Sequence, residues 1–156
     1  ALLQHPLTAI GLLARRLFNG LDVQYPTPYI RSVYQPTWAL AGLNYTVWFG
    51  ALLVLGRTQW RKWPRARWLL LAGLLAPCLA VLPLGIECRY LLPLHLLLYA
   101  TVAFGWPSVW TWHAVQTLSA WRLGLLVVGY VVFLGLCFAA SAAAQATLEF
   151  GPRSLF

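Results

Sequence analysis

Two charged side chains, Glu87 and Arg89, stand between long apolar runs in the segment Leu84–Pro93, which reads LGIECRYLLP. An ionisable group at the edge of a hydrocarbon layer persists when it is paired, reaches the lipid headgroups or performs a function. Arg89 can hold a lipid phosphate or pyrophosphate through two parallel N–H donors, Tyr90 can add a hydroxyl donor, and Glu87 can orient the guanidinium. The alternative is a short interhelical loop in which both charges extend to water.

Other candidate binding groups are few. Arg31 is a second candidate contact for a phosphate, although a solvated turn is the alternative for its segment. His95, inside an apolar run, and His113, in a Trp-rich connector, are candidate ligands for a pigment or haem. A lone His in a membrane helix more often hydrogen-bonds a neighbouring helix, and no second His lies at helical spacing to complete a metal pair. We therefore expect no cofactor, with a pigment or haem at His95 as the alternative.

The sequence offers little for acid–base catalysis. Its only acidic residues, Asp22, Glu87 and Glu149, lie in three separate segments, whereas a carboxylate metal site or an acid–base pair needs such groups close together. We expect Asp22 in a solvated turn, hydrogen-bonded to local backbone, with a binding role as the alternative. There is no Gly-rich phosphate loop, nucleophile elbow or supported Cys–His pair, and the three cysteines form no CxxC pair. We expect no catalytic or metal-binding residues.

The composition predicts an integral membrane protein. Of the 156 residues, 61% are hydrophobic and 9% charged, and the mean hydropathy is +0.71, whereas soluble domains are roughly a quarter charged. The net charge is +8, but five of the eleven Lys and Arg residues fall within residues 57–68. That clustering is typical of membrane topology and of contact with anionic headgroups rather than of nucleic-acid binding.

Apolar runs of spanning length predict an all-α polytopic membrane helix bundle, a single unit over residues 1–156. Residues 1–36 form an amino-terminal interfacial helix, expected to end at Asn19-Gly20, and an external loop. The alternative for this helix is the tail of a truncated transmembrane helix. Residues 37–144 hold about four transmembrane helices, expected at 37–56, 69–84, 86–104 and 123–144, with an aromatic connector at 105–122. Residues 145–156 form a tail. The small residues Ser141–Ala144 allow close approach of another helix.

The basic loop 57–68 is assigned to the cytoplasm by the positive-inside rule. Counting crossings from it places residues 1–36, 85–90 and 145–156 on the extracytoplasmic side, in what we expect to be a bacterial inner membrane. The chain starts at Ala1, within an apolar segment, and contains no Met. We interpret it as a processed chain or a fragment of a longer one.

The phrase Glu87-Cys-Arg-Tyr-Leu-Leu-Pro93 follows a Pro-containing helix and precedes a Leu-rich one. It resembles the E-x-R-Y-x-x-P segment late in polytopic GT-C glycosyltransferases of the protein mannosyltransferase and aminoarabinose transferase type, which use polyprenyl-phosphate sugars. The His5-Pro6 helix and the Tyr/Pro-rich loop after Asp22 also resemble what precedes the final helices in that family. The resemblance implies that Arg89, with Glu87 and Tyr90, contacts a polyprenyl-phosphate lipid.

Those glycosyltransferases carry their catalytic acid on the first external loop of a chain several times longer, and that region is absent here. The resemblance therefore implies a carboxy-terminal remnant, fragment or descended subunit that is inactive alone. The alternative is a small accessory subunit of an energy-converting or photosynthetic membrane complex. It would pack against other membrane subunits through its nine tryptophans and its small-residue faces. A channel or transporter is less favoured, because spans one, two and four offer almost no polar lining.

Overall fold

The computed structural model describes residues 6–23, 38–81, 91–109 and 118–150, and these are almost entirely helical. The helices are α1 (Pro6–Leu21), α2 (Trp38–Arg57), α3 (Arg65–Val81), α4 (Leu92–Val109) and α6 (Ala120–Phe150), with a short 3₁₀ turn, η2 (Trp60–Lys62), between α2 and α3. No strand occurs in the described ranges. The predicted all-α class is therefore confirmed.

Two of the described helices are long and apolar enough to cross a membrane. α2 has 20 residues and a mean hydropathy of 1.6, and residues Ala120–Ala144 of α6 have a mean hydropathy of 2.5 over 25 residues. A helix of about 20 residues is about 30 Å long, the thickness of a bilayer hydrocarbon core. α3, with 17 residues, and the apolar part of α4, Leu92–Trp106, are shorter.

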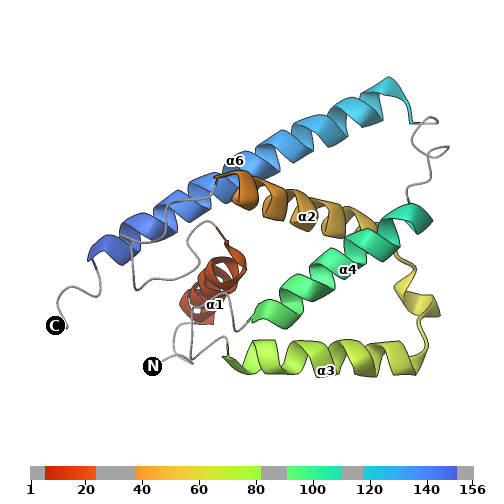
Figure 1. Ribbon diagram of the computed structural model, residues 1–156, viewed down its shortest axis with the longest axis horizontal. Coiled ribbons are helices and arrows are strands. Elements are labelled where there is room, and N and C mark those ends of the chain that lie inside the picture. The colour runs from red at the N-terminus through yellow and green to blue at the C-terminus, as the bar shows by residue number, and fades with distance from the viewer. Residues whose placement is uncertain (1–5, 24–37, 82–90, 110–117, 151–156) are drawn as a thin grey trace.

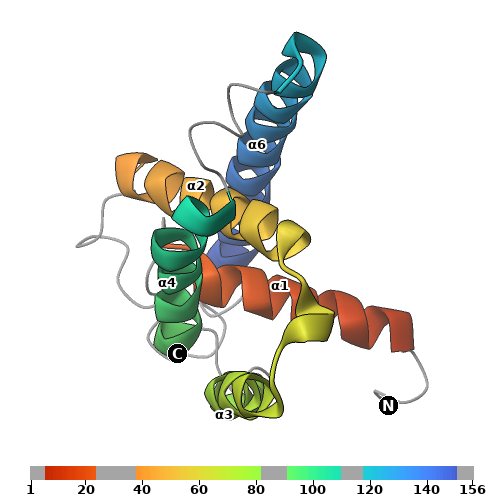
Figure 2. The ribbon, with the colours of Figure 1, turned by 90° about the vertical axis from the view of Figure 1, so that its right-hand side faces the viewer.

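The four longer apolar helices alternate in direction between the two ends of the molecule (Figure 1). α2 and α4 run toward the end where the basic link joins α2 to α3, and α3 and α6 run back. α1 lies at the opposite end, beside the carboxy-terminal part of α6. α1 is seen end-on in Figure 1 and lengthwise in Figure 2. α3 is seen lengthwise in Figure 1 and end-on in Figure 2, so the axis of α1 runs across the axis of α3.

The closest packing joins α2 to α4, at positions where glycines remove the side chain. A Cβ atom added at Gly50 would lie 3.3 Å from Val102 Cγ2, and one added at Gly105 would lie 2.5 Å from Val54 Cγ1. α6 crosses α2 through aromatic contacts, with the Phe49 ring centroid 5.3 Å from that of Tyr130. α3 packs on α4. α2 is therefore the central helix of the described structure.

The predicted boundaries were accurate for α2 and less so elsewhere. α2 lies within one residue of the predicted span 37–56, but α1 continues to Leu21, past the predicted stop at Asn19-Gly20. α3 begins at Arg65, because the Arg and Ala residues after Pro64 are good helix formers. Residues 105–109 and 120–122 of the predicted connector are helical, and so are residues 145–150 of the predicted tail. α6 continues through residues 145–150 because no Gly or Pro occurs between Gly135 and Gly151-Pro152.

Gly105→Ala tests the close approach of α4 to α2. The added methyl group must displace Val54, and overpacking of this kind costs about 1–3 kcal/mol. We expect a lower free energy of unfolding for purified Gly105→Ala in mixed detergent micelles. The control is Gly73→Ala on α3, where an added Cβ meets nothing within 4 Å. It should be neutral or slightly stabilising, because Ala is the better helix former. Equal stability of the two variants would contradict this packing.

Candidate functional site

Polar side chains from three helices converge on the carboxy-terminal end of α1. Asp22, the residue after α1, is 4% exposed. Its Oδ1 accepts a hydrogen bond from Tyr45 Oη at 2.8 Å, and its Oδ2 accepts one from Ser141 Oγ at 2.5 Å. Tyr45 on α2 and Ser141 on α6 are fully buried. The prediction that Asp22 lies in a solvated turn is wrong, because its carboxylate is enclosed between α1, α2 and α6.

The end of α1 also needs partners for its backbone carbonyls, since the last four of any helix lack intrahelical donors. Asn44 Nδ2 donates to Leu21 O at 2.9 Å, and His95 Nε2 lies 3.3 Å from Gly20 O. Side chains of α2 and α4 therefore satisfy two carbonyls that would otherwise be buried without a partner. We call Asp22, Asn44, Tyr45, His95 and Ser141 the Asp22 cluster.

Aromatic rings shield the Asp22 cluster. The Tyr45 ring lies 5.2 Å from Trp48 and 5.1 Å from Phe138, both edge-on, and Phe18 of α1 lies edge-on to Trp48 at 5.7 Å. Hydrogen bonds in such apolar surroundings are stronger than in water, and an unmade one costs more. Within the described residues, two buried polar atoms have no hydrogen-bond partner, Asn44 Oδ1 and Trp48 Nε1.

The geometry of the Asp22 cluster favours joining helices over catalysis. Each carboxylate oxygen of Asp22 accepts a hydroxyl hydrogen bond, and the His95 ring is buried with Nε2 directed at a backbone oxygen. Among the residues described, no group of three His, Cys, Asp or Glu is placed to hold a metal ion. The arrangement can fix α1 to α2, α4 and α6 in one relative position.

Most of the residues predicted to bind a ligand lie outside the described ranges: Glu87, Arg89, Tyr90, Arg31 and His113. His95 is described, and it belongs to the Asp22 cluster. Leu91, which directly follows Tyr90 in the chain, is buried against α1, because a Cβ atom at Gly20 would lie 2.5 Å from Leu91 Cδ1. The predicted phosphate-binding residues Glu87, Arg89 and Tyr90 therefore come directly before Leu91, the residue through which the start of α4 contacts α1.

Sequence reasoning did not bring together Asp22, Asn44, Tyr45 and Ser141. A signal for them existed, because Asn44 and Ser141 are polar residues within long apolar helices, where an unpaired polar group is costly. Such residues require a partner, and Asp22 was available. Nothing in the local spacing shows that the partner is Asp22, since it is separated from Tyr45 by 23 positions and from Ser141 by 119.

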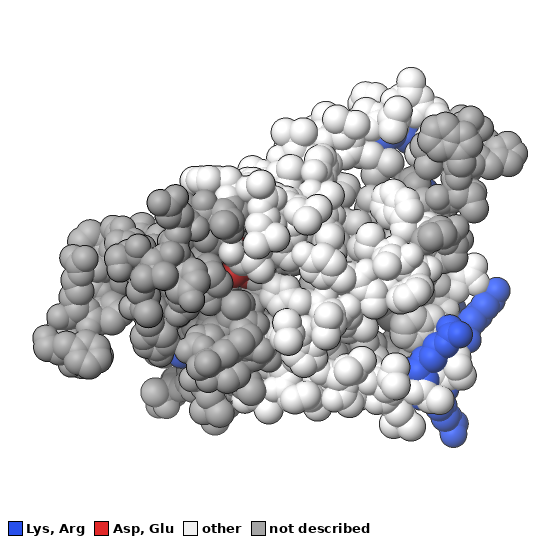
Figure 3. Space-filling view, in the orientation of Figure 1, with Lys and Arg blue, Asp and Glu red and all other residues white. Residues whose placement is uncertain are grey.

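The opposite end of the molecule is basic. The side chains of Arg61, Lys62, Arg65 and Arg67 are exposed in and after η2. Blue side chains project at the right of Figure 3, the end of the molecule where η2 lies in Figure 1. Arg67 lies over the Trp63 ring, 6.0 Å from its centroid. The small red spot left of centre in Figure 3 is Asp22, because it is the one acidic residue whose side chain is described, and little of it reaches the surface.

Ser141→Ala and Tyr45→Phe test whether the Asp22 cluster stabilises the fold. Each leaves one carboxylate oxygen without its hydroxyl donor, and hydrogen bonds to charged groups contribute about 1.5–3 kcal/mol. We expect each variant to lower the free energy of unfolding in mixed micelles by about that amount. Thr101→Val is the control, because Thr101 Oγ1 donates to Leu97 O within its own helix and not to a group on another helix described here. If Thr101→Val lowers the free energy of unfolding as much as Ser141→Ala does, the hydrogen bonds to Asp22 stabilise the fold no more than a bond within one helix.

Comparison of the chain with protein-family models, with curated proteins and with solved structures found no match.

Proposed function

We propose that the chain is an integral membrane protein with four crossings, α2, α3, α4 and α6, and with α1 lying in the membrane interface. Support comes from the two helices of spanning length and from the alternating directions of the four helices. The crosswise position of α1 also suits an interfacial helix, because its exposed residues include Ile10, Leu12 and Leu13 as well as Arg15.

In this proposal the basic link between α2 and α3 faces the cytoplasm and the Asp22 cluster lies near the extracytoplasmic surface of a bacterial inner membrane. The exposed Arg and Lys residues of the link stand at the end of the molecule opposite α1. Such a charge difference between the two ends orients membrane proteins with the positive end inside. The exposed Trp68 beside the link suits the aromatic belt at the headgroup level.

We further propose that the chain acts as the lipid-phosphate-binding carboxy-terminal region of a polyprenyl-phosphate-sugar glycosyltransferase, and does not transfer sugar alone. This proposal rests on the resemblance of Glu87-Cys-Arg-Tyr-Leu-Leu-Pro93 to the E-x-R-Y-x-x-P segment of that family. The contact between Leu91 and Gly20, at the end opposite the basic link, is compatible with it. It fixes the start of α4, directly after Glu87, Arg89 and Tyr90 in the chain, against α1. A phosphate site there would gain rigidity from the Asp22 cluster, as binding sites need.

A second candidate function is that of a structural subunit in a larger membrane complex. One observation favours it: only 6% of the apolar window of α6 is buried, and its exposed side chains include Trp121, Val128 and Val131. Another membrane protein can cover such a face as well as lipid can. The hydrogen bond from His95 to Gly20 O favours a structural role for His95 over pigment or haem ligation.

Cysteine labelling tests the proposed topology. In a background with Cys78, Cys88 and Cys137 replaced by Ala, single cysteines are introduced at the exposed positions Ala14 and Gln59. A membrane-impermeant maleimide should label Ala14→Cys in intact spheroplasts and Gln59→Cys only in inverted vesicles, because α1 and the basic link lie on opposite faces. Labelling of both from the same side would refute the four-crossing arrangement.

Arg89→Gln tests the proposed phosphate site. Loss of a bidentate, charge-assisted contact worth about 1.5–3 kcal/mol should weaken binding of a polyprenyl phosphate to the purified chain at least tenfold. Binding is measured by titration of the protein in nanodiscs of neutral lipid. Arg65→Gln, which removes the same charge from the basic link, should bind as the unaltered chain does. Equal affinities of both variants would overturn the phosphate role of Arg89 and favour the structural subunit.

A further inference from the structure

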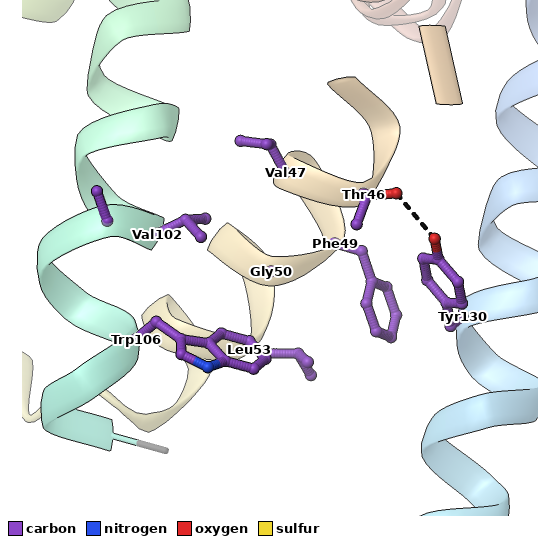
Figure 4. A pocket seen from close by; sticks show the side chains of 9 residues that line it. Thr46, Val47, Phe49, Gly50, Leu53, Val102, Trp106 and Tyr130 are labelled. Carbon is purple, nitrogen blue, oxygen red and sulfur yellow. Dashed lines mark hydrogen bonds between the residues drawn. The ribbon is translucent and has the colours of Figure 1, made fainter. Parts of the chain in front are cut away.

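An open groove separates α6 from α2 and α4 at the basic end of the molecule. Its apolar part has a volume of about 560 Å³ and is lined mainly by Phe49, Gly50 and Leu53 of α2, Val102 and Trp106 of α4, and Tyr130 of α6. Figure 4 shows Trp106 extending from α4 toward Leu53, and Phe49 lying beside the Tyr130 ring. The hydrogen bond of 2.8 Å between Thr46 Oγ1 and Tyr130 Oη closes the groove where α2 and α6 cross.

A second, charged hollow adjoins this groove on the side of the basic end. Leu53 lines both the apolar part and a second hollow of about 460 Å³, which lies between the end of α2 and the start of α6. Two arginines from different helices, Arg57 and Arg122, line this second hollow together with Leu52, Gly56 and Leu125. We call the two parts together the α2–α6 groove. Its chemistry is that of an amphiphile site, with an apolar slot and a cationic mouth.

The length of the α2–α6 groove matches one leaflet of a bilayer. Thr46 and Arg57 stand eleven positions apart on α2, which is about 16 Å of helix. Half of a hydrocarbon core is about 15 Å thick. An acyl chain lying along α2 from the headgroup level would therefore end near the Thr46–Tyr130 bond. The mouth lies at the end of the molecule that carries the basic link, where the cytoplasmic headgroups would be.

We propose that the α2–α6 groove binds one anionic phospholipid of the cytoplasmic leaflet, with its phosphate between Arg57 and Arg122 and an acyl chain in the apolar slot. The inference rests on the proposed membrane insertion and not on the phosphate role of Arg89, which concerns the other end of the molecule. Charge complementarity selects the occupant, because two guanidiniums at the mouth of an apolar slot match a phosphodiester with acyl chains.

The test is native mass spectrometry of the full chain released from mild detergent after titration with phosphatidylglycerol or with phosphatidylcholine of the same acyl chains. We expect one phosphatidylglycerol to be retained, and at least tenfold less phosphatidylcholine. Arg57→Gln/Arg122→Gln should reduce phosphatidylglycerol retention at least tenfold. The matched control, Arg61→Gln/Arg65→Gln, removes two exposed charges of the basic link and should retain the lipid. Equal losses in the two pairs, or equal retention of both lipids, would overturn the proposal.

A charge-neutral pair tests the second hollow, at the mouth of the α2–α6 groove, without changing its charge. Gly56→Phe places a ring in the hollow, where an added Cβ meets nothing within 4 Å, and Gly73→Phe places one in equally open space on α3. Gly56→Phe should reduce retention of phosphatidylglycerol at least tenfold while Gly73→Phe retains it. No difference between the two variants would overturn the site.

Displacement of phosphatidylglycerol by equimolar polyprenyl phosphate, or formation of an oligomer in place of a lipid adduct, would assign the groove to another occupant. Retention in Arg89→Gln separates this test from that of the proposed phosphate site.

Discussion

The carboxylate of Asp22 holds the described structure together at one end. A buried carboxylate is costly unless both oxygens receive hydrogen bonds, and here the donors come from Tyr45 on α2 and Ser141 on α6. If α1 moved away from either helix, the Asp22 carboxylate would lose a hydrogen-bond donor or become exposed. Because Asn44 and His95 bind the carbonyls just before Asp22, α2 and α4 are tied to the same three residues of chain. The remaining helix, α3, is attached through α4.

This arrangement divides the molecule into two ends with different properties. At the α1 end, four helices meet and polar groups specify their positions. At the basic end, α6 diverges from α2 and α4, and the packing is apolar and open, with arginines at its edge. Under the proposed topology, a rigid α1 end suits the proposed site for a lipid-linked substrate, and an open basic end lined by Leu and Trp suits the proposed acyl chain. The hydrogen bonds of the Asp22 cluster therefore fix the α1 end of the molecule, whereas no comparable polar network joins the described helices at the basic end.

Composition and apolar run length were sufficient to predict the helical class and the bounds of α2, since Pro36 and Arg57 flank its apolar run. They could not predict which face of each helix packs, because α2, α4 and α6 are apolar around most of their circumference and have only weak helical periodicity. The contacts that position α2 on α4 depend on Gly50 and Gly105, whose role appears only when the two helices are side by side. Asp22 was misassigned for a related reason. Its neighbours in sequence are typical of a turn, and its hydrogen-bond donors are far away in the chain.

The most direct test of the account is hydrogen exchange of residues 16–23, measured by mass spectrometry in lipid nanodiscs for the unaltered chain and for Ser141→Ala. If Asp22 ties α1 to the other helices, this segment exchanges slowly in the unaltered chain, and at least about tenfold faster in the variant, because the loss of one such bond exceeds 1.4 kcal/mol. Identical exchange in the two proteins, or exchange at the rate of an unstructured peptide in the unaltered chain, would contradict it.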